Sequence, residues 1–377
     1  MRRGRITLLV LLSVLVLCIA PNGYGNDFDG DGKDDVFWYD TATGRVHVWS
    51  MDGMKISKGL DWKAAEGGDY YNYISTSGDF DGDGKEDALL QDTDTYGLYM
   101  YLATERHVKL SVLSPADGWR VHGTGDFDGD GKSDILWQSN ETNDVVIWFM
   151  DGKNRKWASF TDTQAGFDWE IQGTGDFDGD GKSDILWRNT KTHVSGMWLM
   201  DGINVKSTSI ATLQPVSIEV LNSGIGDFDG DGKSDILWYD VPNNTVYTWL
   251  MDGGTIKEAS GQHGNLGDWV IQDIGDFDGD GKSDILWYNP LTSVFAGWLL
   301  NGGATIAKEI VTVFNKDSWK SIPNGNNTMI MLSNRRFRDN RDGSMTDMFT
   351  GLEWMKNTTP CDPGGTTWGN ALKCVDE

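Results

Sequence analysis

The chain has 377 residues, including 48 Gly and 18 Trp, and 38% of it is hydrophobic, a composition that favours many short strands and tight turns over long helices. Its formal net charge of −25 excludes nucleic acid as a partner, because binding to a phosphate backbone requires a basic surface. We therefore expect an all-β protein whose natural ligands include cations.

Residues 1–25 have the pattern of a secretory signal peptide. Three arginines among the first five residues precede an apolar run from Ile6 to Ile19, and small residues follow. The run is shorter than the roughly 20 residues of a membrane-spanning helix, so we expect cleavage and no membrane span afterwards. Leu17 before Cys18 disfavours a lipid anchor. The protein is predicted to be secreted, to the cell surface or the medium, with the periplasm as the alternative.

One string of residues recurs six times from residue 27 onward. The string Asp-Phe-Asp-Gly-Asp-Gly-Lys begins at Asp27, Asp79, Asp126, Asp176, Asp227 and Asp276, at intervals of 47 to 52 residues. An apolar strand, a turn, a second strand and a hairpin signal follow it, as in Ile236–Tyr239 and Val246–Met251 of the fifth copy. Four short strands in about 50 residues are typical of a propeller blade. Residues 26–325 are therefore predicted to form a β-propeller of six four-stranded blades, with seven blades as the alternative.

The strand before each string indicates how the ring of blades closes. This strand begins at Trp119, Trp169 and Trp269 in three of the repeats, is missing before the first string, and has an extra copy at residues 319–325. We expect the extra copy to complete the first blade, because that removes two exposed sheet edges.

The nine residues that open each repeat contain the donors of a calcium site. Calcium takes six to eight hard oxygen ligands, which Asp side chains at loop positions 1, 3, 5 and 9 and a backbone carbonyl at position 7 would supply. Gly at positions 4 and 6 lets the chain curl so that the carboxylates converge, and without a cation these would repel one another. An EF-hand starts alike but has Glu at position 12, where this chain has Trp38 or Trp287 inside a strand, so the Asp at position 9 must close the site. The predicted ligands of about six calcium ions, with each Lys acting through its backbone carbonyl, are Asp27, Asp29, Asp31, Lys33 and Asp35; Asp79, Asp81, Asp83, Lys85 and Asp87; Asp126, Asp128, Asp130, Lys132 and Asp134; Asp176, Asp178, Asp180, Lys182 and Asp184; Asp227, Asp229, Asp231, Lys233 and Asp235; and Asp276, Asp278, Asp280, Lys282 and Asp284.

The repeats resemble the FG-GAP/VCBS family, whose Asp-x-Asp-x-Asp-Gly-x-x-Asp loops occur in the propellers of integrin α-subunits and in bacterial exported proteins. The resemblance covers residues 27–325 and implies a propeller with calcium bound between strands, so the Asp quartets of the six loops inherit the ligand role. Asp34 and Glu86 depart from the Ser found at position 8 of the other loops. The integrin propellers have seven blades, which keeps that number open.

Residues 326–377 depart from the repeat and are predicted to form a partial α+β domain. The string from Arg336 to Trp354 resembles the start of the C-terminal domain of a collagen-like bacterial adhesin (Lcl-C), a family with a C-type-lectin character. The stretch from Asp339 to Asp347 is not a seventh calcium loop, because Arg341 and Gly343 stand where Asp residues are needed.

The residues outside the loops show no catalytic arrangement, so we expect a protein that is not an enzyme. The five His stand at unrelated places in their repeats, and the conspicuous Asp residues are assigned to calcium. The expected function is extracellular recognition or adhesion through a glycan or protein ligand. A calcium-stabilised polysaccharide lyase or other carbohydrate-active enzyme, and a structural spacer for the C-terminal module, are the alternatives. The tryptophans at equal places in the repeats predict packing between blades rather than a sugar-stacking surface: Trp148, Trp198, Trp249 and Trp298.

Overall fold

The structure is a computed structural model of the chain, which divides into two units, Met1–Met331 and Leu332–Glu377. It describes residues 26–40, 45–62, 73–92, 97–103, 108–113, 118–211, 220–240, 243, 245–263, 269–289, 294–302, 304–310, 312–313, 337–339, 344–347 and 353–355. The predicted signal peptide lies outside these ranges. Every regular element in them is a β-strand, which confirms the all-β prediction, and they contain no helix with the length and apolarity of a membrane span.

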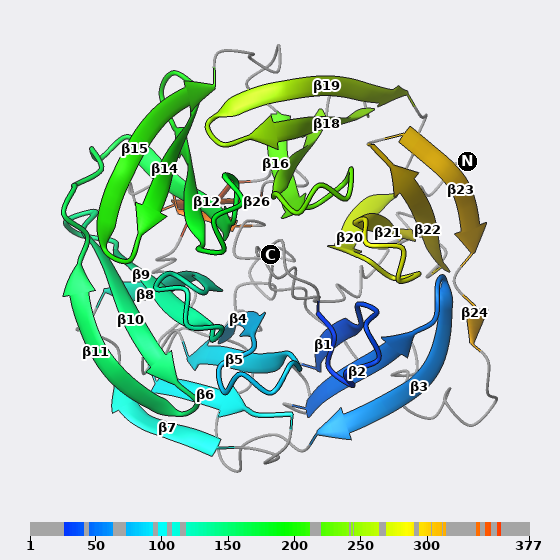
Figure 1. The fold of residues 1–377 in the computed structure, drawn as a ribbon, viewed down its shortest axis with the longest axis horizontal. Helices are drawn as coiled ribbons and strands as arrows, with labels where there is room; N and C mark the ends of the chain where they lie inside the picture. Colours follow the sequence, from blue (N-terminus) through cyan, green and yellow to red (C-terminus); the bar gives the residue numbers. More distant parts are fainter. Residues whose placement is uncertain are drawn as a thin grey trace, which may run out of the picture. The chain divides into compact units, whose positions relative to one another are not determined.

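Six four-stranded sheets form a β-propeller in the first unit, which confirms six blades (Figure 1). Blade 1 contains β1 (Val36–Asp40), β2 (Arg45–Met51), β3 (Lys55–Trp62) and β24 (Thr312–Val313). Blade 2 contains β4 (Tyr73–Gly78), β5 (Asp87–Asp92), β6 (Gly97–Tyr101) and β7 (Val108–Leu113). Blade 3 contains β8 (Trp119–Gly125), β9 (Asp134–Ser139), β10 (Val145–Asp151) and β11 (Asn154–Phe160). Blade 4 contains β12 (Trp169–Gly175), β13 (Asp184–Asn189), β14 (Ser195–Asp201) and β15 (Asn204–Ala211). Blade 5 contains β16 (Val220–Gly226), β17 (Asp235–Asp240), β18 (Thr245–Asp252) and β19 (Thr255–His263). Blade 6 contains β20 (Val270–Gly275), β21 (Asp284–Asn289), β22 (Val294–Asn301) and β23 (Ala304–Ile310).

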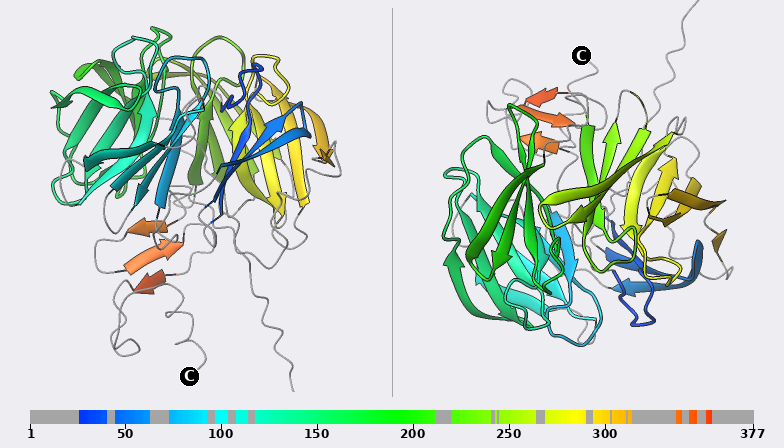
Figure 2. Two further views of the ribbon diagram at one scale, coloured as in Figure 1. Left: turned by 90° about the horizontal axis from the view of Figure 1, so that it is seen from below. Right: turned by 45° about the horizontal axis from the view of Figure 1, so that its top comes forward.

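Each of blades 2 to 6 is an antiparallel meander in which strands that follow one another in sequence pair with one another. Outer strands such as β11, β15 and β19 follow the periphery of the ring in Figure 1, and Figure 2 shows the sheets on edge. In these five blades the acidic string connects the first strand to the second, and in blade 1 it comes directly before β1. The fold therefore presents one acidic loop per blade in an equivalent position.

The core lies between neighbouring blades and contains the repeated tryptophans. In blade 4, the rings of Trp187 and Trp198 lie 4.7 Å apart, and they pack with Phe127 and Ile147 of blade 3. Trp148, Trp198, Trp249 and Trp298 are all less than 10% exposed. Their burial confirms that these residues form the packing between blades, since a sugar-stacking ring would have to be open to solvent.

The first blade is completed by a segment from the far end of the propeller. Strand β24 pairs in parallel with the outer strand β3, with Thr312 opposite Lys55 and Val313 opposite Ile56. The predicted closing segment, residues 319–325, lies outside the described residues. The closure that the structure describes is therefore on the outer edge of blade 1, which β24 covers.

The second unit contains a small sheet of three strands, β25 (Phe337–Asp339), β26 (Ser344–Asp347) and β27 (Glu353–Met355). Asp339 pairs with Met345 where β25 and β26 run antiparallel, and residues 340–343 between them lie outside the described residues. Any helix of the predicted α+β domain would lie outside the described residues.

Candidate metal centre

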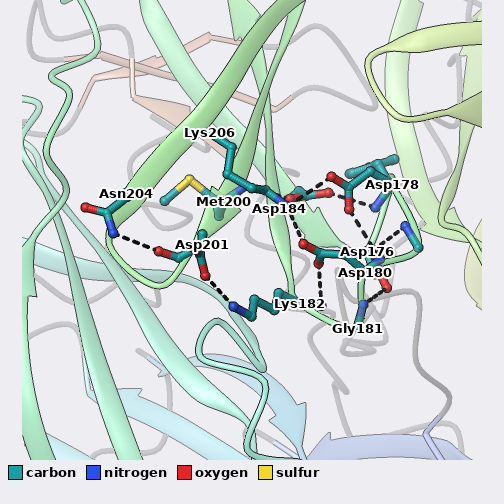
Figure 3. A network of polar contacts seen from close by, with 12 residues as sticks. Asp176, Asp178, Asp180, Gly181, Lys182, Asp184, Met200, Asp201, Asn204 and Lys206 are labelled. Atoms are coloured by element: carbon teal, nitrogen blue, oxygen red, sulfur yellow. Dashed lines mark hydrogen bonds and ion pairs between the residues drawn. The ribbon is translucent and has the colours of Figure 1, made fainter.

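Each acidic loop is folded around the side chain of its first Asp. In blade 4, Asp176 Oδ1 accepts a hydrogen bond from the N–H of Gly179 at 2.7 Å, and Oδ2 accepts one from the N–H of Gly181 at 2.8 Å (Figure 3). The other five loops contain the same pair of bonds. Gly179 and Gly181 have φ values of 77° and 82°, a left-handed conformation that costs glycine no strain. The two glycines of the string are therefore what allows the loop to wrap around a carboxylate.

The ninth loop residue is a buried Asp that joins the loop to its own blade. Asp184 Oδ2 accepts the N–H of Phe177 at 2.9 Å, and Oδ1 accepts the N–H of Met200 at 2.7 Å. The bond to Oδ1 recurs in all six blades. Burial raises the pKa of Asp184 to about 7 and the pKa values of Asp35 and Asp284 to about 8. Such a carboxyl needs either a proton or a nearby cation at neutral pH.

Carboxylates converge within individual loops closely enough to share one metal ion. In five of the loops, three residues each bring one ligand oxygen to within 4.8 Å of the others. Loops 1 and 4 do so with positions 1, 3 and 5, and loops 2, 3 and 5 with positions 1, 3 and 9. The groups are Asp27, Asp29 and Asp31; Asp79, Asp81 and Asp87; Asp126, Asp128 and Asp134; Asp176, Asp178 and Asp180; and Asp227, Asp229 and Asp235. In the sixth loop, burial and the neighbouring carboxylates of Asp280 and Asp276 raise the pKa of Asp278.

Three buried carboxylate oxygens in these loops accept no hydrogen bond. They are Asp29 Oδ1, Asp128 Oδ1 and Asp284 Oδ2. A buried charged oxygen without a partner is costly, and a cation bound in the loop would remove that cost. A donor set of carboxylates, without Cys or His, suits a hard divalent ion such as Ca²⁺ or Mg²⁺ better than zinc. The residues present therefore fit a hard divalent cation.

The lysine at position 7 joins each loop to the preceding one. A Cβ atom on Gly129 of blade 3 would lie 3.2 Å from Lys182 Cε of blade 4, so the lysine stem covers that glycine. The Lys182 ammonium contacts the Asp201 carboxylate in the β14–β15 hairpin, away from its own loop. Lys33 covers Gly279 in the same way, so the contact continues from the sixth loop to the first.

Backbone hydrogen bonds also connect the loops around the ring. The N–H at position 8 donates to the carbonyl of position 1 in the preceding blade, as from Ser234 to Asp176 at 2.7 Å. This bond recurs at all six junctions. Between blades 6 and 1, the Asp34 N–H donates to the Asp276 carbonyl and the Gly53 N–H to the Phe277 carbonyl, both at 2.8 Å. We call this contact between blades 6 and 1 the closing junction.

Additional buried acids lie at the two junctions of blade 1. Asp34 replaces Ser at position 8; its Oδ2 accepts the Asp276 N–H at 2.5 Å, and burial raises its pKa to about 8. Glu86, at position 8 of blade 2, has a pKa raised well above its usual range by burial. Asp273 in β20 is buried, and its Oδ2 accepts no hydrogen bond. These acids were not predicted as ligands, and they place further carboxyl groups beside loops 1, 2 and 6.

All thirty residues predicted as ligands lie in the described part of the chain. In five of the loops the structure brings three of the Asp side chains together, whereas the role of the lysine carbonyl and the identity of the ion stay predictions. Sequence reasoning missed three lysines that contact the loop carboxylates from the outer strands: Lys156, Lys206 and Lys257. Their signal was available, because each follows the Asp of its Asp-Gly hairpin by five residues.

Comparison with known families supports the assignment of the repeats. The model of the FG-GAP-like repeat matches residues 126–187 and 227–287, which contain the loops of blades 3 to 6. The VCBS and Lcl-C resemblances stay predictions. No curated protein matches the sequence.

Solved structures of propellers resemble the chain at low sequence identity. A lectin from Agrocybe aegerita, described as recognising non-reducing terminal N-acetylglucosamine, is 16% identical with a TM-score of 0.51, over 81% of this chain and 82% of the lectin. A chain of a nidogen/laminin complex is 11% identical with a TM-score of 0.47, over 74% of this chain and 96% of that one. A virginiamycin B lyase from Staphylococcus aureus is 10% identical with a TM-score of 0.46, over 80% of this chain and 85% of the lyase. At this identity, the likeness to the lectin concerns the fold alone.

Proposed function

We propose that this protein is an exported calcium-binding propeller that recognises a glycan or protein ligand outside the cell, and that it acts by binding and not by catalysis. The observation that carries the proposal is the set of buried loop oxygens without a hydrogen-bond partner, on Asp29, Asp128 and Asp284. The signal-peptide pattern of residues 1–25 and the FG-GAP-like repeats support export.

Calcium in each loop would be held by the Asp residues at positions 1, 3, 5 and 9 and the carbonyl at position 7. The ion would supply positive charge to carboxylates that otherwise repel. The chain's own contribution is orientation, because backbone N–H groups fix Asp176 and Asp184 from opposite ends of the loop. Since Asp184 also accepts the N–H of Met200 in β14, a filled loop would be joined to the middle of its blade.

A ligand-binding surface is supported by exposed aromatic residues on blade 3 and in its connection to blade 4. The Trp157 ring stacks on the buried Phe149 ring at 4.0 Å with an angle of 10° between the planes, and Trp157 is 45% exposed. Phe160 and Phe167 are also exposed, at 57% and 63%. A rigid aromatic ring with one open face suits the apolar face of a sugar or an apolar side chain. That the lectin shares the propeller fold adds support to a glycan ligand.

The test is an array of glycans and extracellular proteins, probed with the protein in calcium and after chelation with EDTA. We expect binding in calcium, loss of binding after chelation, and at least a tenfold loss with Trp157→Ala, because that variant removes the aromatic face. Trp157→Phe is the matched control, which keeps an aromatic ring and should bind nearly normally.

Three outcomes would contradict parts of the proposal. Binding unchanged in Trp157→Ala would place the ligand elsewhere on the molecule. Release of new reducing or unsaturated ends from a polysaccharide would identify an enzyme. A failure to bind any ligand, with calcium taken up normally, would favour a structural spacer.

A further inference from the structure

Three blades carry a lysine at the same irregular place in the pairing of their two outer strands. In blade 4, Val205 pairs with Met200 and Ser207 with Leu199, so Lys206 between them is the extra residue of a β-bulge. Lys156 and Lys257 occupy the same bulge in blades 3 and 5. A bulge turns its side chain away from the regular alternation of the strand. The irregularity therefore places a lysine beside the acidic loop of its own blade.

The ammonium groups of these lysines contact the carboxylates at loop positions 3 and 5. Lys206 Nζ lies 3.0 Å from Asp178 Oδ2 and also contacts Asp180 Oδ2 (Figure 3). Lys257 Nζ lies 2.9 Å from both Asp229 Oδ2 and Asp231 Oδ2. Each lysine therefore adds one positive charge where two of the expected metal ligands meet.

Blade 3 shows that the ammonium and a metal ion would use different oxygens of one carboxylate. Lys156 Nζ lies 3.6 Å from Asp128 Oδ2 and contacts Asp130 Oδ2. Asp128 Oδ1, on the other side of the same carboxylate, is one of the buried oxygens without a hydrogen-bond partner. The lysine therefore does not fill the loop, and a cation bound there would lie beside the ammonium.

The bulge of blades 1 and 6 contains no lysine. In blade 1 the bulge residue is Ser57, between Ile56 and Lys58, and Ser57 Oγ donates to the backbone carbonyl of Ser50. In blade 6 it is Ile306, between Thr305 and Ala307. The corresponding part of blade 2 lies outside the described residues. Loop 1 therefore has the same nine-residue motif as loops 3 to 5 without the additional positive charge. In loop 6, the position-7 lysine takes part of that place, because Lys282 Nζ lies 3.2 Å from Asp280 Oδ2.

We propose that Lys156, Lys206 and Lys257 are built-in counter-ions that divide the calcium loops into two classes. Loops 3 to 5 have part of their carboxylate charge neutralised by the protein itself, so they bind calcium more weakly and keep their shape without it. Loop 1, which has no such lysine, binds calcium more tightly and depends on it. This inference rests on the proposed calcium binding and concerns how its strength is distributed around the ring.

Two opposing effects of the lysine can be compared by magnitude. A single positive charge about 5 Å from a divalent cation raises the dissociation constant about tenfold, even in a medium of high dielectric constant. The ammonium also holds the carboxylates in place, but partly exposed ion pairs of this kind contribute a factor of only about two to five. Lys156 and Lys206 are about 30% exposed, which places them in this range. Repulsion therefore exceeds pre-organisation, and the lysines weaken calcium binding.

The test is a calcium titration of the chelator-treated full chain by isothermal calorimetry. The wild-type protein should show a tight and a weak class of sites, with dissociation constants that differ about tenfold. The triple variant Lys156→Met, Lys206→Met and Lys257→Met keeps the length of the side chains and removes their charge. It should convert the three weak sites to tight ones, and Ser57→Lys should weaken one tight site.

Lys191→Met is the matched control, because Lys191 pairs with Asp168 away from the loops and its loss changes the net charge alone. It should leave both classes unchanged. If the triple variant binds calcium no more tightly than the wild type, the counter-ion inference is overturned while calcium binding stands. If the wild-type protein takes up no calcium, both the counter-ion inference and the proposed calcium binding are overturned. If the triple variant does not fold, Ser57→Lys and the single variant Lys206→Met replace it. The inference is then overturned if Lys206→Met binds calcium no more tightly than the wild type and Ser57→Lys binds it no more weakly.

Discussion

The loops of blades 3 to 5 and the loops of blades 1 and 6 have the same nine-residue motif in different electrostatic surroundings. In blades 3 to 5, a lysine from the outer strand reaches the carboxylates at positions 3 and 5. Loop 1 has Ser57 at that place and no lysine there, whereas loop 6 has Ile306 there and an ion pair between its own Lys282 and Asp280. The comparison teaches that a repeated motif does not make its copies equivalent, because residues outside the motif determine how much charge an ion must neutralise.

Removal of the metal should have the largest effect. Each filled site contributes about 2.7 kcal/mol when calcium is present at a hundred times its dissociation constant, and six sites share one ring. We expect chelation with EDTA to lower the melting temperature by about 10 °C or more. Limited proteolysis of the chelated protein should cut blade 1 before blades 3 to 5, because the lysines of the outer strands stabilise only the latter. An unchanged melting temperature would show that no ion stabilises the ring, and earlier cuts in blades 3 to 5 would reverse the comparison.

The stability of the metal-free protein should fall as the pH rises, because burial raises the pKa values of its ninth-position Asp residues. Burial raises the pKa of Asp35 and Asp284 from an ordinary value of 3.8 to about 8, so the metal-free fold keeps these groups protonated where the unfolded chain would not. Their contribution to stability is present below about pH 4 and is lost as the pH rises towards about 8. The melting temperature without metal should therefore fall by about 5 °C between pH 5 and pH 8. With calcium the fall should disappear, because the ion favours the ionised carboxylates; equal slopes with and without calcium would contradict this account.

Two Asn variants should separate the contribution of hydrogen bonds to stability from that of metal binding. Their effect on stability should be smaller than those of chelation and pH. Both oxygens of Asp184 accept backbone N–H groups, so Asp184→Asn turns an amide N–H towards another donor and should cost about 1–3 kcal/mol without metal. Asp284 Oδ2 accepts no hydrogen bond, so Asp284→Asn should cost less without metal. In calcium, both variants should lower the melting temperature clearly. Denaturant unfolding of both variants with and without calcium measures these differences, and equal costs without metal would contradict the role assigned to the Asp284 oxygen.

Much of the fold could be predicted because the repeat places local signals at fixed intervals. The two glycines of each string predict a left-handed loop, and the equal spacing of Trp198 and its counterparts predicts packing between blades. Both signals are local in sequence, and the structure confirms them. The number of blades follows directly from the number of strings, since each string opens one sheet.

The features that the sequence did not reveal depend on contacts between residues far apart in the chain. The pairing of Thr312 with Lys55 joins two segments whose residues carry no matching pattern, and strand β24 has only two residues. The contact of Lys206 with Asp178 depends on a β-bulge, which appears in the strand register and not in the spacing of apolar residues. The additional acids Asp34 and Glu86 were visible as departures from Ser, but their burial follows from packing against the neighbouring blade.

The bond between the Asp34 N–H and the Asp276 carbonyl determines when the ring can close during synthesis of the chain. A ribosome makes Asp34 early and Asp276 only after almost all of the propeller, so the first blade has to wait for the last before its partner exists. Contacts between such distant residues form slowly, and until then the apolar faces of the blades at both ends of the growing ring are exposed to other chains. Any shortened form of the chain that stops before blade 6 therefore remains an open ring with an exposed apolar sheet face at each end, and we expect it to aggregate.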